Sequence, residues 1–367
     1  MLSAEEDVMK FGAMVATKID DWQLLKEVED LGFDHGWVPD SQMIWSDTYA
    51  TLALAAANTS RIKLGTGVAI APTRLAPVTA HSIASIARLA PGRVFLGIGT
   101  GHTAMRVMGM RPMKPGAFRE YLRVVRGLLA GDEVDYTHGA ETRAIRFLHR
   151  ERKFIELDQP IPIWVAANGP GALAVAGAYG DGRISALNEP PDMTRDSLAA
   201  IQAGAAKVDR TLPADFHTAA LTSAVVLHPG ETLASERVID AVGSQVAAAL
   251  HYCWEGVQQS GNANQVPAPV RELFAEYCEY VEKMETPRDK RYLQIHEGHC
   301  SFLVPEERRF ITPEAIRTWI LAGTPDEIIH QLRAAERAGL REITLLPPMD
   351  HAREVFRDVA KHVIARY

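Results

Sequence analysis

The chain has 367 residues, of which 47% are hydrophobic, and a formal net charge of −7. These values predict a globular protein with one large core, or with two compact domains, and they give no basic footprint for nucleic acid or anionic lipid. The acidic start lacks the basic character of a secretory signal, and no apolar run has membrane-spanning length, so we expect a cytoplasmic protein with no membrane partner. Cys253, Cys278 and Cys300 lack the close spacing of zinc or redox motifs, which predicts reduced thiols.

Eight short apolar runs alternate with amphipathic helical patterns along the chain. The runs, which we expect to be strands, are 11–16, 35–40, 62–70, 93–99, 161–167, 183–187, 217–227 and 342–346. The helical patterns are 20–31, 47–57, 77–90, 118–130, 171–179, 192–208, 324–338 and 353–365. Eight alternations predict an α/β fold of the (β/α)8 TIM-barrel type that takes in residues 1–367 as a single domain, with a doubly wound open sheet as the alternative.

Two segments interrupt this alternation. Residues 131–160 scatter apolar positions among charges, which indicates a small hairpin or an extended excursion before the fifth strand. Residues 229–311 are far longer than an ordinary connection and have a helical pattern. On a barrel this helical insertion follows the seventh strand at the catalytic end, where it would serve as a lid or pocket wall, or else as a dimer contact.

The stretch 161–184 indicates a strand, a tight turn, a helix and a further strand. Asn168, Gly169, Pro170 and Gly171 form the turn. Pro170 suits a first helical turn, and the two glycines allow a ligand to approach the backbone. Because a helix N-terminus presents free amides and the positive end of its dipole, this turn is a candidate phosphate site. It is equally compatible with an ordinary strand-to-helix turn that binds nothing.

Other strand ends carry further candidates, because the functional groups of barrels lie there. Glycines recur in Gly65-Thr-Gly-Val68 and Gly97-Ile-Gly-Thr-Gly101, where a flat ring or a phosphate could approach closely. Motifs of dinucleotide-binding folds, P-loops and nucleophile elbows are absent from the sequence. His296 and His299 have a spacing that a metal could use on a helix, but no third ligand is evident, so we expect no metal.

These motifs together resemble the luciferase-like flavin monooxygenase superfamily, which includes bacterial luciferase and deazaflavin-dependent reductases and dehydrogenases. The resemblance covers about 11–187, the segment that begins at Gly323 and the last strand. Its markers are Gly32-Phe-Asp-His-Gly-Trp-Val-Pro-Asp40, Gly65-Thr-Gly-Val68 with Pro72 and Pro77, Gly92-Arg-Val-Phe-Leu-Gly-Ile-Gly-Thr-Gly101 and Ala166-Ala-Asn-Gly-Pro-Gly171.

The resemblance implies a (β/α)8 barrel that holds FMN or the deazaflavin coenzyme F420 at its C-terminal mouth, with no metal. The cofactor-binding residues that it implies are Asp40 at the end of the second strand, Gly67, Val68 and Ala69 behind the ring, Thr100, Gly101 and His102 beside it, and Ala167, Asn168, Gly169, Pro170 and Gly171 at the phosphate. It also implies a cis peptide bond between Gly67 and Val68.

The sequence departs from the pattern of the deazaflavin-dependent alcohol and sugar dehydrogenases at two positions. Ser41 stands where they typically have His, and His102 stands where they have Glu, although Trp45 matches. Since Ser41 is no base for hydride abstraction from an alcohol, we favour a reduced-FMN monooxygenase that inserts one oxygen atom from O2 into a small organic substrate. His102 is the candidate catalytic residue, because an unperturbed imidazole titrates near neutrality, or else a structural histidine.

Several further expectations follow from this interpretation. The substrate-binding candidates are Ser41, Trp45, His296 and His299. The partners are the substrate, a separate flavin reductase, and further copies of the chain in a dimer or tetramer. An F420-dependent reductase or dehydrogenase and a non-catalytic flavin-binding barrel are the alternative functions.

Overall fold

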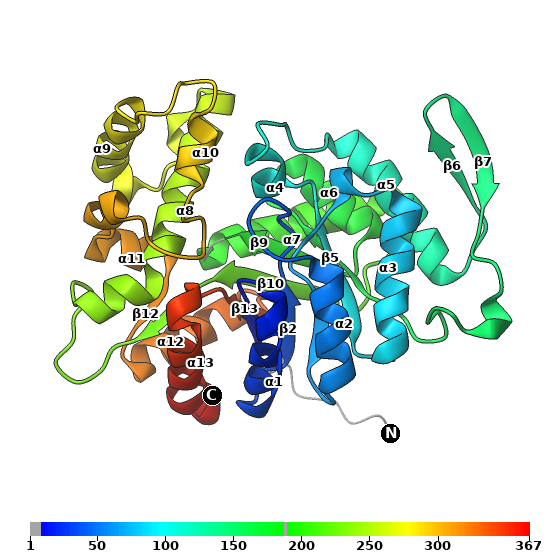
Figure 1. Ribbon diagram of the computed structural model, residues 1–367, viewed down its shortest axis with the longest axis horizontal. Coiled ribbons are helices and arrows are strands. Elements are labelled where there is room, and N and C mark those ends of the chain that lie inside the picture. Colours follow the sequence, from blue (N-terminus) through cyan, green and yellow to red (C-terminus); the bar gives the residue numbers. More distant parts are fainter. Residues whose placement is uncertain (1–8, 187–188) are drawn as a thin grey trace.

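Parallel strands close into a barrel in the computed structural model, which describes residues 9–186 and 189–367 (Figure 1). The barrel strands are β1 (Lys10–Met14), β2 (His35–Val38), β3 (Lys63–Thr66), β4 (Ala69–Ile70), β5 (Val94–Gly99), β8 (Ile163–Ala166), β9 (Gly182–Ala186), β10 (His217–Thr222) and β13 (Glu342–Leu345). They follow the order β3-β2-β1-β13-β10-β9-β8-β5-β4, and pairing of β3 with β5 closes the ring. The predicted (β/α)8 barrel is confirmed, and the open sheet is wrong. Leu187, the last residue of the predicted sixth strand, lies outside the described residues.

Helices between the strands cover the outside of the barrel (Figure 1). They are α1 (Gln23–Asp30), α2 (Thr48–Asn58), α3 (Ala76–Leu89), α5 (Pro115–Ala130), α6 (Pro170–Tyr179), α7 (Pro191–Ala206), α12 (Pro325–Arg337) and α13 (Ala352–His362). Their apolar faces are buried against the strands, as Leu25 and Val28 of α1 illustrate. In the described part of the chain, no helix combines the length and apolarity that a bilayer span requires.

Two of the predicted strands are divided in the structure. The third run becomes β3 and β4, and the peptide bond between Gly67 and Val68, which separates them, is cis as predicted. The seventh run becomes β10 and β11 (Ala224–Val226). Only β10 belongs to the barrel, because β11 pairs with β12 (Leu321–Gly323) in a separate two-stranded sheet.

The two long connections take different forms. Residues 131–160 contain an antiparallel hairpin of β6 (Val134–His138) and β7 (Glu141–Ile145), which projects from the barrel (Figure 1). Residues 229–311 are mainly helical and contain α8 (Glu236–Ser260), α9 (Arg271–Glu282) and α10 (Arg291–Ile295). Together with α11 (Pro313–Trp319), these helices form a group at one side of the molecule, to the left of the barrel in Figure 1.

Large aromatic side chains fill the barrel interior where neighbouring strands carry glycine. Trp37, Phe95 and Trp164 pack together, and the rings of Phe95 and Trp164 stack with centroids 4.1 Å apart. A Cβ atom at Gly65 would overlap the Phe95 ring, and one at Gly97 would overlap the Thr66 carbonyl oxygen. The glycines at these two positions are therefore explained by the packing of the interior.

A buried carboxylate lies beside these rings at the start of β13. Trp37 Nε1 donates to Glu342 Oε1 at 2.8 Å, and the hydroxyl of Thr344 donates to the same oxygen at 2.7 Å. His217 Nε2 lies 2.6 Å and His35 Nδ1 lies 2.8 Å from Glu342 Oε2. Burial alone would raise the pKa of Glu342, but the two histidines outweigh it and lower this pKa well below its usual range.

This carboxylate network gives a test of the barrel interior. We expect Glu342→Ala to lower the free energy of unfolding by about 3 to 5 kcal/mol, because it leaves several buried donors without an acceptor. Glu342→Gln, which keeps the shape and one acceptor oxygen, is the matched control and should cost less. Chemical denaturation monitored by circular dichroism measures both losses, and an alanine variant as stable as the wild type would contradict the assignment.

Candidate functional site

The carboxyl ends of the barrel strands form a mouth at the end of the barrel that also carries α4 (His102–Arg106) and the insertion (Figure 1). In barrels of this type the βα connections at this end carry the functional groups. An ion pair between Arg106 of α4 and Glu255 of α8 joins the two sides of the mouth. Both side chains are largely buried, at 8% and 12% exposure. We therefore take this end as the candidate active site.

The floor of the mouth is formed where β4, β5 and β8 end side by side. A Cβ atom at Gly99 would lie 3.0 Å from Val68 Cγ2 and 3.1 Å from Ala166 Cβ, so these two side chains flank the glycine. Val68, Ala166 and Thr100 are partly exposed, whereas Ala69 and Gly101 are buried. The exposed apolar part of this floor could support a flat ring, as predicted for Val68.

Gly67 has a packing role beside any role toward a ligand. A Cβ atom at this position would lie 2.5 Å from Met14 Cε and 3.1 Å from Trp37 Cβ. Gly101 adopts a left-handed conformation with φ 84° as it leads into α4. This left-handed conformation explains why the residue is glycine, because residues with a Cβ atom rarely adopt it.

The predicted phosphate turn lies at the N-terminus of α6, next to the end of β5. Gly169 is the N-cap, Pro170 is the first helical residue, and a Cβ atom at Gly169 would meet no atom within 4 Å. By contrast, a Cβ atom at Gly171 would lie 3.0 Å from Pro115, so Gly171 is explained by packing. Asn168 and Gly169 are exposed, which leaves open space in front of the first turn of a ten-residue helix. This is the position expected of an anion at a helix N-terminus.

The backbone before this turn is held by a buried arginine. Ala167 N donates to Ile184 O at 3.0 Å, and Arg183 Nε donates to Ala167 O at 2.9 Å. Arg183 also makes a bidentate ion pair with Glu189, with distances of 2.8 and 2.6 Å. Because both the amide and the carbonyl of Ala167 are held, the turn is positioned before any ligand binds.

Asp40 is buried behind the floor, where it braces the backbone. Its carboxylate accepts from Ile70 N at 3.2 Å and pairs with Arg74. Burial raises the pKa of Asp40, although the charge of Arg74 opposes this shift. The structure therefore shows a bracing contact with β4, and a direct contact of Asp40 with a cofactor stays a prediction.

His102 lies exposed at the rim of the mouth, directly after Gly101. Enough protein surrounds its ring that desolvation, followed by the charge of Arg106, lowers the pKa of His102, while Glu255 opposes the shift. Its ring centroid lies 6.3 Å from that of Tyr252 on α8. Desolvation and Arg106 thus favour the neutral imidazole of His102, and its catalytic role stays a prediction.

The insertion also contacts the loop after β2. Trp45 Nε1 donates to Ser301 Oγ at 2.9 Å, and the Trp45 ring centroid lies 6.5 Å from that of His299. Ser41 is buried nearby, and its carbonyl accepts from the backbone amides of Ile44 and Trp45. Trp45, Ser41 and His299 are therefore brought to one side of the mouth, as the predicted substrate site requires.

Three histidines of the insertion converge on one another beside Trp45. They are His251 of α8, together with His296 and His299 of the turns that follow α10. His251 Nε2 lies 3.0 Å from Glu307 Oε1, and His296 Nε2 lies 2.9 Å from Glu255 Oε1. His296 and His299 do not lie on a helix, so the helical spacing considered for them is wrong. Burial, followed by the charges of His296 and His251, lowers the pKa of His299.

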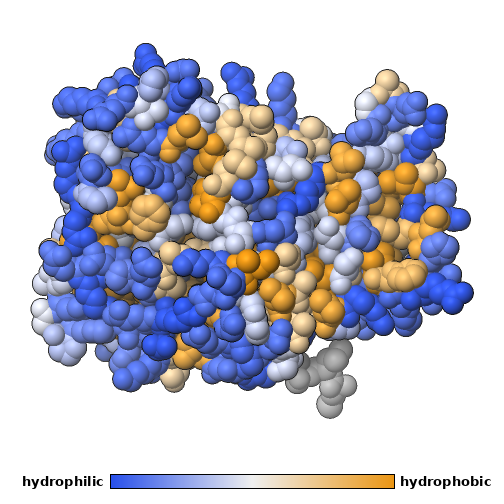
Figure 2. Space-filling model, viewed as in Figure 1, coloured by the Kyte–Doolittle hydropathy of each residue, from blue (hydrophilic) through white to orange (hydrophobic). Residues whose placement is uncertain are grey.

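The outer surface around the mouth is apolar in part. Figure 2 shows apolar atoms gathered between the insertion and the barrel. Large exposed hydrophobic side chains in the loops after β2 and α4 and in the insertion include Met43, Met110, Leu293 and Phe302. Small organic substrates commonly bind where apolar surface surrounds a few polar groups.

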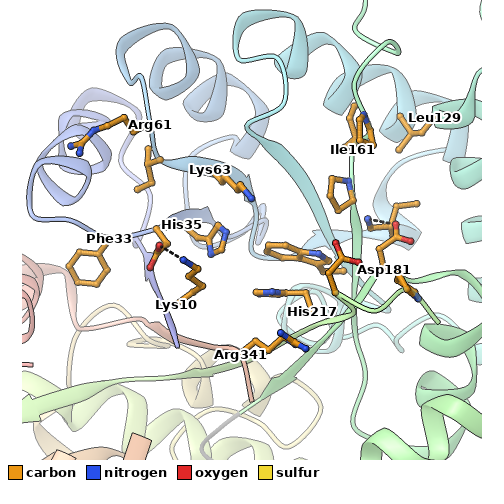
Figure 3. A pocket seen from close by; sticks show the side chains of 18 of the residues that line it. Lys10, Phe33, His35, Arg61, Lys63, Leu129, Ile161, Asp181, His217 and Arg341 are labelled. Atoms are coloured by element: carbon orange, nitrogen blue, oxygen red, sulfur yellow. Dashed lines mark hydrogen bonds and ion pairs between the residues drawn. The ribbon is translucent and has the colours of Figure 1, made fainter. Parts of the chain in front are cut away.

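A cavity of about 1170 Å³ lies at the opposite, amino-terminal end of the strands. Figure 3 shows Lys10, His35, Lys63, His217 and Arg341 around it, with an ion pair of 3.4 Å between Lys10 and Asp34. The same cavity is lined by Trp164, whose ring stacks on that of His217. Because residues at this end of a TIM barrel serve stability, we assign the cavity no catalytic role.

Sequence reasoning missed His251, Glu255 and Arg106. Each belongs to an element whose place over the mouth depends on contacts between distant parts of the chain. One signal was available, since His251 and Glu255 are polar residues four apart on a long helix that is otherwise mostly apolar around them. That spacing puts both side chains on one face of α8.

Comparisons with known proteins place the chain in a family of enzymes. Residues 18–342 match the model of the luciferase-like monooxygenase family. A 5,10-methylenetetrahydromethanopterin reductase of Methanolobus tindarius is 36% identical over 187 residues, which cover 50% of this chain and 55% of the relative. An F420-dependent glucose-6-phosphate dehydrogenase of Beutenbergia cavernae is 37% identical over 200 residues, which cover 50% of this chain and 57% of the relative. The match thus spans about half the length of these curated relatives.

Among solved structures, the coenzyme F420-dependent tetrahydromethanopterin reductase of Methanopyrus kandleri superposes with a TM-score of 0.67. The superposition covers 98% of this chain and 99% of the other, at 21% sequence identity. At that identity the similarity establishes the shared fold.

Proposed function

Since this chain belongs to the luciferase-like monooxygenase family and is an oxidoreductase, we propose that it uses coenzyme F420 to transfer a hydride to or from a small organic substrate. The observation that carries the proposal is the 37% identity over half of the chain to a dehydrogenase named as F420-dependent. The family name alone is compatible with FMN as well. The non-catalytic barrel is set aside because the relatives are enzymes.

The mouth fits a deazaflavin on two physical grounds. The partly exposed side chains of Val68 and Ala166 offer a flat apolar floor. The open space at Gly169 lies at the N-terminus of α6, where backbone amides and the helix dipole favour a phosphate. We infer that the floor supports the ring and that the turn 167–171 holds the phosphate.

Bound coenzyme F420 would supply the ring carbon that donates or accepts the hydride. The protein's part is to orient the substrate over the floor and to move the accompanying proton. Trp45 provides an apolar wall held by its bond to Ser301. His102, neutral because of its lowered pKa, can accept a proton at the rim of the mouth.

The reduced-FMN monooxygenase that the sequence favours has weaker support than its F420-dependent alternative. Its main ground was the lack of a base at Ser41. The relative named as an F420-dependent dehydrogenase supports the alternative more strongly than this single position supports FMN. The separate flavin reductase and the homo-oligomer stay predictions.

Cofactor affinity separates the two alternatives. We expect oxidised F420 to bind the purified protein at least about tenfold more tightly than FMN in anaerobic titrations followed by fluorescence quenching. If FMN binds as tightly as F420, and the protein with reduced FMN consumes O2 in the presence of a substrate, the monooxygenase is correct and the proposal fails.

The phosphate turn can be tested by a graded pair of variants. Gly169→Val should weaken F420 binding by at least about tenfold, because its branched side chain occupies the space proposed for the phosphate. Gly169→Ala, which is as poor an N-cap as the valine variant but adds only one methyl group, should weaken binding less. Thermal denaturation checks that both variants remain folded, and equal F420 affinity in wild type and Gly169→Val would refute the phosphate site.

We expect the ionisation of His102 to govern how kcat/KM depends on pH. Because the pKa of His102 is lowered, this dependence should appear at a lower pH than for an ordinary histidine. A base must be unprotonated, so the acidic limb of kcat/KM should fall below the ordinary histidine value of about 6.5. The charged and titratable groups that face its ring are Arg106, Glu255 and Tyr252. We expect His102→Ala to lower kcat with little change in F420 affinity and to remove that limb. A variant that retains both the wild-type kcat and the same limb would show that His102 is structural.

A further inference from the structure

The cluster of His251, His296 and His299 has the donor set of a metal site. Each histidine offers one ring nitrogen, and these three atoms lie within 4.8 Å of one another. His251 and His296 are buried, at 2% and 6% exposure, while His299 is partly exposed. The third ligand that the sequence did not reveal is thus supplied by α8.

Hydrogen bonds to two carboxylates fix the free nitrogens of the buried pair. A carboxylate accepts, so the bonds from His251 Nε2 to Glu307 and from His296 Nε2 to Glu255 place the proton on Nε2 in both rings. Their Nδ1 atoms then keep the lone pairs. A carboxylate behind the distal ring nitrogen is the arrangement that orients histidine ligands in metal sites.

The Nδ1 atoms that the carboxylates leave free are the candidate ligand atoms. His251 Nδ1 is buried and has no hydrogen-bond partner, although an unsatisfied buried polar atom is costly. His296 Nδ1 lies 3.4 Å from His299 Nδ1, in a hydrogen bond between the two rings that a bound ion would replace. A tetrahedral zinc ion with Zn–N distances of about 2.0 to 2.1 Å separates two ligand nitrogens by about 3.4 Å. One ligand pair therefore already has the required spacing, and a bound ion would satisfy His251 Nδ1.

We propose that His251, His296 and His299 bind a zinc-type divalent cation whose fourth position opens toward Trp45 at the barrel mouth. The partial exposure of His299, beside the Trp45 ring, places that position on the substrate side. Three protein ligands with one open position are the pattern of a catalytic site. The ion would hold an oxygen atom of the substrate, a hydroxyl or a carbonyl, and this role rests on the proposed function, whereas the binding of the ion does not.

A second cluster of possible metal ligands consists of His35, His217 and Glu342. Its hydrogen bonds differ from those of the three histidines. There both histidine nitrogens face the carboxylate itself, and the Glu342 oxygens also accept from Trp37 and Thr344. Within that network His35 Nδ1 lies 2.8 Å from Glu342 Oε2 but has no hydrogen-bond partner of good geometry. Of these two groups in the described part of the chain, the three-histidine cluster is the one that has no carboxylate among its candidate ligands.

Cobalt titration tests the site directly. Full-length protein without a histidine tag is treated with a chelator, dialysed and titrated with Co2+ in the absence of any cofactor. We expect one equivalent of Co2+ to give the visible ligand-field bands of a four-coordinate ion, and Zn2+ to displace it. A wild-type protein that binds Co2+ without these bands, or in no fixed stoichiometry, would overturn the proposal.

Variants assign the binding to the three histidines. We expect His251→Ala and His299→Ala to weaken Co2+ binding at least about 100-fold, and Glu307→Gln to weaken it by about 10-fold. His330→Ala, at an exposed histidine of α12, is the matched control and should bind as the wild type does. His299 is partly exposed, so its variant is expected to fold even if His251→Ala does not. Unchanged affinity in folded His299→Ala would overturn the assignment.

The failure of this proposal and the failure of the proposed function are distinguishable. Metal binding is measured without cofactor, and F420 affinity is measured on metal-free protein. Tight F420 binding without a cobalt site removes the metal proposal alone, and a cobalt site without F420 binding removes the proposed cofactor alone.

Discussion

The closure of the barrel between β3 and β5 determines where the candidate groups at the strand ends lie. The two strands approach closely because Gly65 has no side chain to collide with Phe95, and the aromatic rings of Phe95, Trp37 and Trp164 then fill the interior. Direct pairing of β4 with β5 and of β5 with β8 brings the ends of these three strands to one side of the mouth. The floor at Val68 and the turn at Gly169 are consequences of that register.

A second constraint is the attachment of the insertion to the mouth. The buried pair of Arg106 with Glu255 and the bond from Trp45 to Ser301 hold helices that the sequence separates widely from the strands they cover. Ion pairs this buried are costly to desolvate unless their hydrogen-bond partners are complete. Here Glu255 is shared between Arg106 and His296, so the attachment of the insertion and the orientation of an imidazole are coupled. The lid role predicted for the insertion is consistent with these contacts and stays a proposal.

The sequence predicted the local elements well and the long-range contacts poorly. Apolar runs and helix signals located the strands and the covering helices, because hydrophobic periodicity and capping are local properties. The run 217–227 looked like one strand, but its second half pairs with β12, and periodicity carries no information about the partner of a strand. The spacing of the glycines suggested that a ligand approaches the backbone at several positions. In the structure, close packing explains the glycines at Gly65, Gly97 and Gly171. His251 could not be joined to His296 and His299 without knowing how α8 crosses the mouth.

A crystal structure of the protein grown with coenzyme F420 tests the central claim most directly, namely that the active site lies between the barrel mouth and the insertion. We predict the deazaflavin ring against Val68 and Ala166, with the phosphate in front of the amides of the α6 N-terminus and His102 beside the ring. Electron density for F420 in the cavity at the opposite end of the barrel, between His35 and His217, would contradict this placement.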